Sequence, residues 1–383
     1  MIPSNITLIL TLSFLIWGSP FVAKFVRIPI PSVEIILGSV FAYIGLVSNN
    51  EYFDLIAEIG FLYLMFLAGM EVDLKQITKS PKDVIQKAIL FISFMSLFSI
   101  TLGMIFRLNT ITIISMPLIS IGLLASLSKT YGKDQAWLKL AFIAGVLGEV
   151  VSIAALTIFD AASTTGFNIA LIIKIGYLLF FIISVYMVYK LLNLLFWWFP
   201  ELKNILVPKA DTSDQDIRLA MALFFILIAV MLSLELELAL GAFIAGIAIS
   251  AFFHHEKQLG EKMSSLGFGF LVPLFFLHVG ASFDLKSLMV EGVVSGALLI
   301  TTLMILSRIL AASVLKKISG SRDALLAALS LSMPLTLLVA VATIGYETKL
   351  LDLLSYYQLI LASIFEILIS MTAIKVLQSR RKS

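Results

Sequence analysis

Long apolar stretches alternate with short polar segments along the whole chain. A helix needs about 20 apolar residues to cross a hydrocarbon core, because in lipid every backbone polar group must be satisfied within the segment. The pattern predicts thirteen such spans, near residues 5–24, 31–48, 53–71, 83–106, 111–128, 136–160, 168–198, 217–233, 236–253, 263–281, 288–315, 322–346 and 354–376. The longest polar connection, Glu201 to Arg218, is expected to be a linker between two halves. The sequence therefore predicts an all-α integral membrane protein with 13 transmembrane helices and no soluble domain.

The basic residues test this number of spans and give an orientation. Cytoplasmic loops of membrane proteins carry an excess of Lys and Arg. If the N-terminus lies outside, the inner segments hold most of the 27 basic residues, and the outer segments hold only Arg107, Lys174, Lys286 and Lys349. We therefore expect an odd number of spans in the inner (cytoplasmic) cell membrane, with the N-terminus outside and the C-terminus in the cytoplasm.

The amino-acid composition excludes several classes of protein and of binding site. Of 383 residues, 60% are hydrophobic and 13% are charged, and the mean hydropathy of +1.06 excludes an ordinary soluble domain. The chain has no cysteine and three histidines, which argues against disulfides, thiolate metal sites and iron–sulfur clusters. A net charge of +3 is too small for a nucleic-acid-binding surface, and no glycine-rich phosphate loop is present. We expect no cofactor, no resident metal and no nucleic-acid partner.

The two halves of the chain are similar in sequence. The string SMPLI at 115–119 returns as SMPLT at 332–336, and the same offset of 217 residues carries Glu149 onto Glu366. The segment FLYLMFLAGMEVDLK, ending at Lys75, resembles FLVPLFFLHVGASFDLK, ending at Lys286. The matched spans are seven apart, and an odd separation means opposite orientation in the membrane. The sequence predicts an inverted-topology repeat, with spans 1–7 in residues 1–200 and spans 8–13 in residues 201–383.

Two prolines interrupt equivalent spans of this repeat. Pro117 and Pro334 lie in the middle of the fifth and twelfth spans, where each removes a backbone donor. Such breaks are tolerated in lipid where the freed backbone lines a cavity or is buried. Two crossed discontinuous helices would direct half-helix ends and free carbonyls at one place, which suits a cation. The alternative is a pair of ordinary proline kinks.

Three hydroxyl residues flank these breaks: Ser115, Ser120 and Thr336. Their oxygens are candidates for coordinating a transported ion. They are equally suited to capping the backbone groups that the breaks set free.

Three charged residues lie deep in predicted spans: Glu149 in the sixth, Arg308 in the eleventh and Glu366 in the thirteenth. A charge at the bilayer centre costs about 2.5 kcal/mol or more, so such residues face a polar cavity or a partner. Burial disfavours the ionised carboxyl and a nearby cation favours it, so Glu149 is the candidate that alternately binds a proton and a cation. Glu366 is expected to be a structural charge partner. The alternative is a salt bridge of Arg308 with either glutamate.

Other polar and aromatic residues are weaker candidates. Glu34, Glu58 and Glu71 lie near span ends, where they are expected to be solvated or to line a vestibule. His254 and His255 suit an interfacial pair or a pH sensor, and His278 an interior hydrogen bond or a proton relay. Three tryptophans are expected to anchor cytoplasmic span ends in the interface: Trp137, Trp197 and Trp198.

Four motifs together resemble the cation:proton antiporter superfamily, in the branch of bacterial sodium/proton and potassium-efflux antiporters, over essentially the entire chain. They are RIPIPSVEIILG (27–38), AEIGFLYLMFLAGMEVDL (57–74), LGAFIAGIAIS (240–250) and LVPLFFLHVGASFDL (271–285). The resemblance implies a 13-helix protein, usually a homodimer, with a mobile core that moves relative to a scaffold. It also implies that the fifth and twelfth helices are the crossed, broken ones.

The resemblance also assigns roles to residues. The family's ion-binding acid in the sixth helix, commonly preceded by Asn, Asp or Gln, corresponds to Glu149 preceded by Gly148. The family's basic residue in the eleventh helix corresponds to Arg308. A single carboxylate implies electroneutral exchange, whereas glutamate in place of aspartate lengthens the side chain by one methylene. The nucleotide-binding C-terminal domain of many potassium-efflux relatives has no counterpart in this sequence.

The favoured hypothesis is a secondary transporter that exchanges Na+, K+ or Li+ for H+ by alternating access, with both ions competing for Glu149. A second hypothesis is a non-transporting membrane sensor or assembly protein on the same fold. A third is a uniporter or symporter for an organic anion, with Arg308 binding the substrate carboxylate. An enzyme is not expected, since no nucleophile, base and orienting group stand out.

Overall fold

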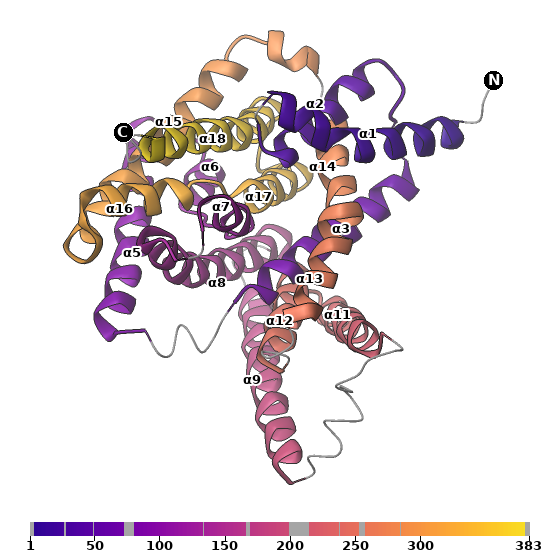
Figure 1. The fold of residues 1–383 in the computed structure, drawn as a ribbon. Coiled ribbons are helices and arrows are strands. Elements are labelled where there is room, and N and C mark those ends of the chain that lie inside the picture. Colours follow the sequence, from indigo (N-terminus) through magenta and orange to yellow (C-terminus); the bar gives the residue numbers. More distant parts are fainter. Residues whose placement is uncertain are drawn as a thin grey trace. The chain divides into compact units, whose positions relative to one another are not determined.

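The fold is helical throughout the part of the chain that the structure describes. The computed structural model describes residues 4–26, 28–48, 50–72, 80–132, 134–165, 169–198, 214–236, 238–252, 257–283 and 285–379 (Figure 1). Its α-helices are α1 (Ser4–Val26), α2 (Ile30–Tyr43), α3 (Glu51–Met70), α5 (Lys82–Ile105), α6 (Thr110–Ser115), α7 (Leu124–Tyr131), α8 (Ala136–Thr165), α9 (Ile169–Trp198), α11 (Gln215–Ser233), α12 (Leu238–Phe252), α13 (Lys257–Leu266), α14 (Val272–Ala281), α15 (Val293–Ala311), α16 (Lys316–Ser330), α17 (Leu335–Glu347) and α18 (Leu353–Ser379). One π-helical turn, η1 (Gly267–Leu271), and two 3₁₀ turns, η2 (Leu285–Met289) and η3 (Ala312–Val314), complete it.

Nine helices within the described ranges are long and apolar enough to cross a membrane, and three apolar helices are shorter. Each of the thirteen predicted stretches overlaps at least one described helix. The count of thirteen spans stays a prediction. One boundary differs for a clear reason: the second span was expected to reach residue 48, but α2 ends at Tyr43 because Gly45 takes the left-handed conformation, with φ of 84°.

Two compact units share the chain. The first unit contains Met1–Phe61, Lys75–Ile153 and Phe270–Ser383, and the second contains Leu62–Leu74 and Ala154–Gly269. Helices α3 and α8 therefore contribute residues to both units. This division differs from the expected repeat halves, 1–200 and 201–383, because each unit takes segments from both halves. The repeat halves stay a prediction.

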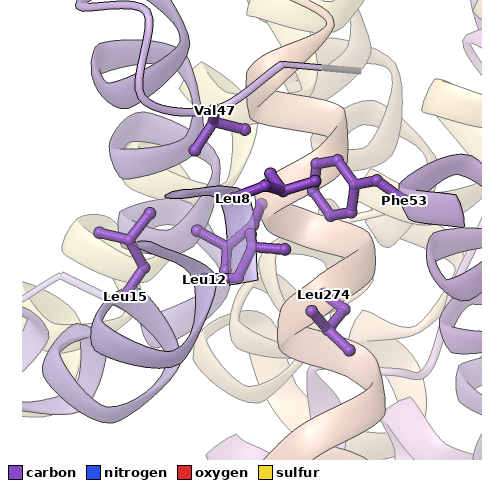
Figure 2. Close-up of a cluster of buried hydrophobic side chains, with 7 residues drawn as sticks. Leu8, Leu12, Leu15, Val47, Phe53 and Leu274 are labelled. Carbon is purple, nitrogen blue, oxygen red and sulfur yellow. The ribbon is translucent and has the colours of Figure 1, made fainter. Parts of the chain in front are cut away.

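The first unit holds the helices α1, α2, α5–α7 and α14–α18, in which α15 and α18 lie side by side (Figure 1). An apolar cluster fixes α1 against its neighbours. Leu8, Leu12 and Leu15 of α1 pack with side chains from the α2–α3 connection, α3 and α14, namely Val47, Phe53, Leu274 and Leu277 (Figure 2). Because lipid tails are as apolar as leucine, such contacts between membrane helices are stabilised by van der Waals packing.

Glycines bring α2 and α14 of the first unit into backbone contact. A methyl group at Gly38 would meet the carbonyl oxygen of Leu277, and a methyl group at Gly280 would meet that of Ile35. The hydroxyl of Ser39 also donates to the Gly280 carbonyl oxygen at 2.8 Å. Only glycine allows this approach, which is typical of membrane helices that pack through small residues.

The second unit contains an equivalent glycine contact between α3 and α12. A methyl group at Gly69 would meet the carbonyl oxygen of Phe243, and one at Gly246 would meet that of Phe66. These four positions correspond to those of the α2–α14 contact with offsets of 208 and 211 residues. In the same unit, the Tyr63 hydroxyl donates to the carbonyl oxygen of Met263 at 3.1 Å.

Candidate ion-binding site

The first interrupted helix exposes backbone groups inside the first unit. Helix α6 ends at Ser115 and α7 begins at Leu124, with Pro117 in the segment between them (Figure 1). Two amides of this segment donate to side chains of α8: Ile119 N–H to the hydroxyl of Ser152 at 2.8 Å, and Ile121 N–H to Glu149 Oε2 at 2.5 Å. The break is therefore held by one face of α8.

Glu149 is fully buried beside this break. Besides the Ile121 amide, its carboxyl accepts the hydroxyl of Ser120 at Oε1, over 3.4 Å. Within the described part of the chain, no basic side chain forms an ion pair with it. The acid is held by neutral donors, which stabilise a carboxylate without supplying a compensating charge.

Arg308 of α15 pairs with Glu366 of α18. Their closest atoms, Nη1 and Oε1, are 3.1 Å apart, and both side chains are fully buried. The guanidinium also donates from Nη2 to the carbonyl oxygen of Leu118 at 2.6 Å, and from Nη1 to that of Met304 at 3.0 Å. Arg308 thus joins Glu366 to the freed backbone of the first break. The sequence left its partner open between two glutamates, and the structure pairs it with Glu366.

The second interrupted helix approaches the same part of α8. Helix α16 ends at Ser330 and α17 begins at Leu335, with Pro334 at the start of α17. A methyl group at Gly145 would meet Ile121 and Leu124 of the first interrupted helix and Leu331 of the second. Both breaks therefore contact α8 one turn before Glu149.

Gly148 leaves no room for a side chain next to Glu149. A Cβ atom there would lie 2.9 Å from the Cβ and 2.5 Å from the Cδ1 of Ile119, which fills this space from the break. At the position where the antiporter motif has a polar residue, this chain has Gly148, and the apolar side chain of Ile119 from the break occupies that space. The site consequently holds one carboxylate and not a pair.

The other residues predicted to bind the ion differ in whether they contact Glu149. Ser120 contacts Glu149, whereas the Ser115 hydroxyl donates to the carbonyl oxygen of Thr112 in its own half-helix at 2.8 Å. The side chain of Thr336, in α17, lies outside the described residues. The ion-binding roles of all three residues stay predictions.

The weaker candidates are placed differently from one another. Glu34 was expected to be solvated, and this is wrong: it is 2% exposed in α2 and accepts the hydroxyl of Ser19 at 3.0 Å. Glu58 is exposed and Glu71 is half-buried. His278 makes a hydrogen bond, 2.8 Å from Nε2 to an oxygen of Asp54, but it is half-buried and Asp54 is exposed, so its assignment to the interior is wrong. His254 and His255 lie outside the described residues.

The three tryptophans predicted to be interfacial anchors also differ in their exposure. Trp197 and Trp198 are exposed, as expected of residues at a lipid interface, but Trp137 is 1% exposed. Its assignment as an interfacial anchor is therefore wrong. Its indole ring instead packs edge-on against the ring of Tyr131.

Three residues of the site were missed by the sequence analysis: Leu118, Ile119 and Ser152. Ser152 lies three residues after Glu149, so the spacing of one helical turn could have identified it. Leu118 and Ile119 act through the backbone or through shape and carry no sequence signal. Among the described residues, no group of three or more His, Asp or Glu residues could hold a resident metal ion.

Comparisons with known proteins agree on one family. Residues 9–378 match the family described as "Sodium/hydrogen exchanger, transmembrane". The chain is 25% identical over 355 residues to the Na+/H+ antiporter of Enterococcus hirae, covering 90% of this chain and 89% of that protein. It is 23% identical over 381 residues to YjbQ of Bacillus subtilis (strain 168), covering 93% of this chain but only 60% of that protein's length.

A solved structure shows the same fold. The sodium proton antiporter MjNhaP1 from Methanocaldococcus jannaschii, solved at pH 8, matches with a TM-score of 0.67 over 97% of this chain and 96% of the other chain. The sequence identity of 16% limits this likeness to the fold. Together with the apolar helices, the family match identifies a multi-pass transmembrane protein.

Proposed function

Because the chain belongs to the sodium/hydrogen exchanger family, we propose that it exchanges a monovalent cation for H+ across the membrane, with Glu149 as the group that both ions share. One observation carries this proposal. Glu149 is the buried acid that contacts the first break, and its described partners are an amide and a hydroxyl and not a basic side chain. Its charge must therefore be balanced by the ion that it binds.

Exchange follows from competition for one carboxyl group. A protonated Glu149 is neutral and has low affinity for a cation, whereas an ionised Glu149 attracts Na+, K+ or Li+. Backbone carbonyls of the break and the Ser120 hydroxyl are suitable additional oxygen donors. One carboxylate exchanges one proton for one monovalent cation, so we propose electroneutral transport by alternating access.

The architecture we propose has thirteen spans in two inverted halves, with the broken helices crossing beside α8. The matching glycine contacts of α2–α14 and α3–α12 support the repeat, and the convergence of both breaks on Gly145 supports the crossing. The distribution of Lys and Arg supports an inner-membrane protein with an outside N-terminus. A homodimer is proposed from the family resemblance alone.

The alternative of an organic-anion transporter is less well supported. Such a substrate would need a cationic group that is free to bind it. The terminal nitrogens of Arg308 donate to the carbonyl oxygens of Met304 and Leu118, and its charge is paired with that of Glu366.

The test uses purified protein in liposomes with an imposed pH gradient. Addition of Na+, K+ or Li+ should dissipate the gradient in the wild type, and Glu149→Gln should abolish the response. Glu291→Gln, an exposed carboxylate between η2 and α15, is the control and should behave as wild type. Exchange that survives in Glu149→Gln would refute this role of the residue.

Competition can be measured directly. Where H+ occupies most of the sites, the apparent KM for the cation should rise about tenfold for each unit by which the pH falls, because the cation needs the deprotonated carboxyl. A KM that does not depend on pH would mean that the two ions do not share one group. Absence of any cation-driven proton flux would favour the non-transporting alternative.

A further inference from the structure

Few charged side chains are buried in this protein. Among the Asp, Glu, Lys and Arg residues whose side chains the structure describes, those with less than a tenth of their surface exposed are Glu34, Glu149, Arg308 and Glu366. Three of them lie around the first break. Glu34 belongs to α2, and its described partner is Ser19 of α1.

The fixed charges near the break cancel. Arg308 and Glu366 contribute one positive and one negative charge, at a separation of 3.1 Å. The pair therefore leaves the charge of Glu149 uncompensated, although Arg308 also bonds to the segment that holds Glu149 through the Leu118 carbonyl. The net charge around the break is then set by what Glu149 carries.

The group formed by Glu149, Arg308 and Glu366 therefore has three states, which differ in what Glu149 binds. With a proton on Glu149 the group of three side chains is neutral, and with a monovalent cation on ionised Glu149 it is neutral again. With neither ion it carries one negative charge. An uncompensated charge deep in a membrane protein is expensive, and that cost opposes movement of the empty site through the low-dielectric barrier between the two aqueous faces.

We propose that Glu366 keeps exchange obligatory by cancelling the charge of Arg308, so that the core is neutral when Glu149 carries either ion and negative when it carries none. This inference rests on the proposed function. Glu366 is a charge-balancing residue here and is not required to touch the transported ion. By cancelling the charge of Arg308, it leaves the empty core charged and so prevents the transporter from returning empty, which would waste the ion gradient.

Two single substitutions should then act in opposite ways. In Glu366→Gln, the positive charge of Arg308 is free to balance ionised Glu149, so the empty core becomes neutral and returns without an ion, whereas the loaded core now carries one positive charge and becomes the slow state. In Arg308→Gln, the empty core carries two negative charges and the loaded core carries one, so the return of the empty core remains the slow step. A purely structural ion pair predicts instead that both variants lose activity in the same way, because each leaves one buried charge unpaired.

The experiment follows radioactive Na+ leaving liposomes into sodium-free, strongly alkaline buffer, with thiocyanate on both sides as a permeant anion. Wild-type efflux should be slow and should accelerate when external Na+ or H+ is added. Efflux from Glu366→Gln should not accelerate on this addition, because the movement of its loaded core, and not the return of its empty core, is the slow step. A charge at the bilayer centre costs about 2.5 kcal/mol or more. A cost of this size makes the return of a charged empty core about 70-fold slower than that of a neutral one.

Two further variants make the result decisive. Glu366→Asp keeps the charge and should stay coupled. Arg308→Gln/Glu366→Gln restores neutrality and should also require external Na+ or H+, and removing both partners of a buried pair is often tolerated by the fold. Uncoupled efflux from this double variant, or tightly coupled efflux from a folded Glu366→Gln, would overturn the inference. A wild type that shows no exchange would instead refute the proposed function.

Discussion

Single residues of α8 explain why the site has one acid. Glu149 and Ser152 lie one turn apart and hold the amides of Ile121 and Ile119. Gly148 directly precedes Glu149, at a position where Ile119 occupies the space of a side chain. The lone carboxylate is thus a consequence of packing, because any second polar group at Gly148 would collide with the break.

The first prediction tests this packing. Gly148→Asn should destabilise the protein by about 1–3 kcal/mol, as overpacked core positions do, and should impair exchange because Ile119 must move. Combining it with Ile119→Ala should restore both the melting temperature and transport. Melting curves of the detergent-solubilised protein and the pH-gradient assay measure these effects.

A control separates packing from the loss of glycine itself. Gly18→Ala on α1 introduces a methyl group with no atom within 4 Å, so its melting temperature should remain close to that of the wild type. If Gly148→Asn is as stable as Gly18→Ala, Ile119 does not restrict this position.

The sequence identifies the charged residues of the site but not their pairing. Glu149, Arg308 and Glu366 stand out because charges in long apolar stretches are expensive. Which glutamate faces Arg308 depends on the rotation and packing of α8, α15 and α18, which hydropathy does not encode. Glu34 was misplaced for the same reason, since proximity to a helix end does not show that a side chain faces solvent.

At the scale of helices, two glycine contacts define how the elements pack. In α2–α14 and in α3–α12, a glycine of each helix lies against a carbonyl group of the other. Corresponding positions are related by offsets of 208 and 211 residues, and the two contacts have the same arrangement of glycine and carbonyl group. Hydropathy predicts the approximate extents of these helices, but it does not reveal that they approach at backbone distance.

The second prediction compares the two copies. Gly280→Ala and Gly246→Ala should each strongly reduce the yield of monodisperse protein, because each new Cβ would lie 2.0 Å from a backbone oxygen, that of Ile35 or Phe66. Neither carbonyl group can rotate away as a flexible side chain could. Size-exclusion chromatography of the purified variants measures the effect.

Gly176→Ala, on α9, provides the matched control, since nothing lies within 4 Å of its new methyl group. It should elute like the wild type. A normal profile for Gly246→Ala beside a disrupted Gly280→Ala would show that the two contacts are not equivalent.

At the scale of the whole molecule, the absence of cysteine allows the predicted orientation to be tested with single reactive sites. Glu347→Cys, at the end of α17, should react with a membrane-impermeant maleimide added to intact cells. Lys316→Cys, at the start of α16, should react only after the membrane is permeabilised. Both native side chains are exposed, so labelling reports the side of the membrane. The opposite pattern would invert the proposed topology.

The four tryptophans of this chain sit in contrasting surroundings. Trp17, Trp197 and Trp198 are largely exposed on apolar helices, whereas Trp137 is enclosed near the start of the helix that carries Glu149. A quencher dissolved in the lipid acyl chains is expected to quench the three exposed tryptophans but not Trp137. The first unit therefore contains a native fluorophore at Trp137, and a change in the emission that survives quenching would report rearrangement of α8 without any attached dye.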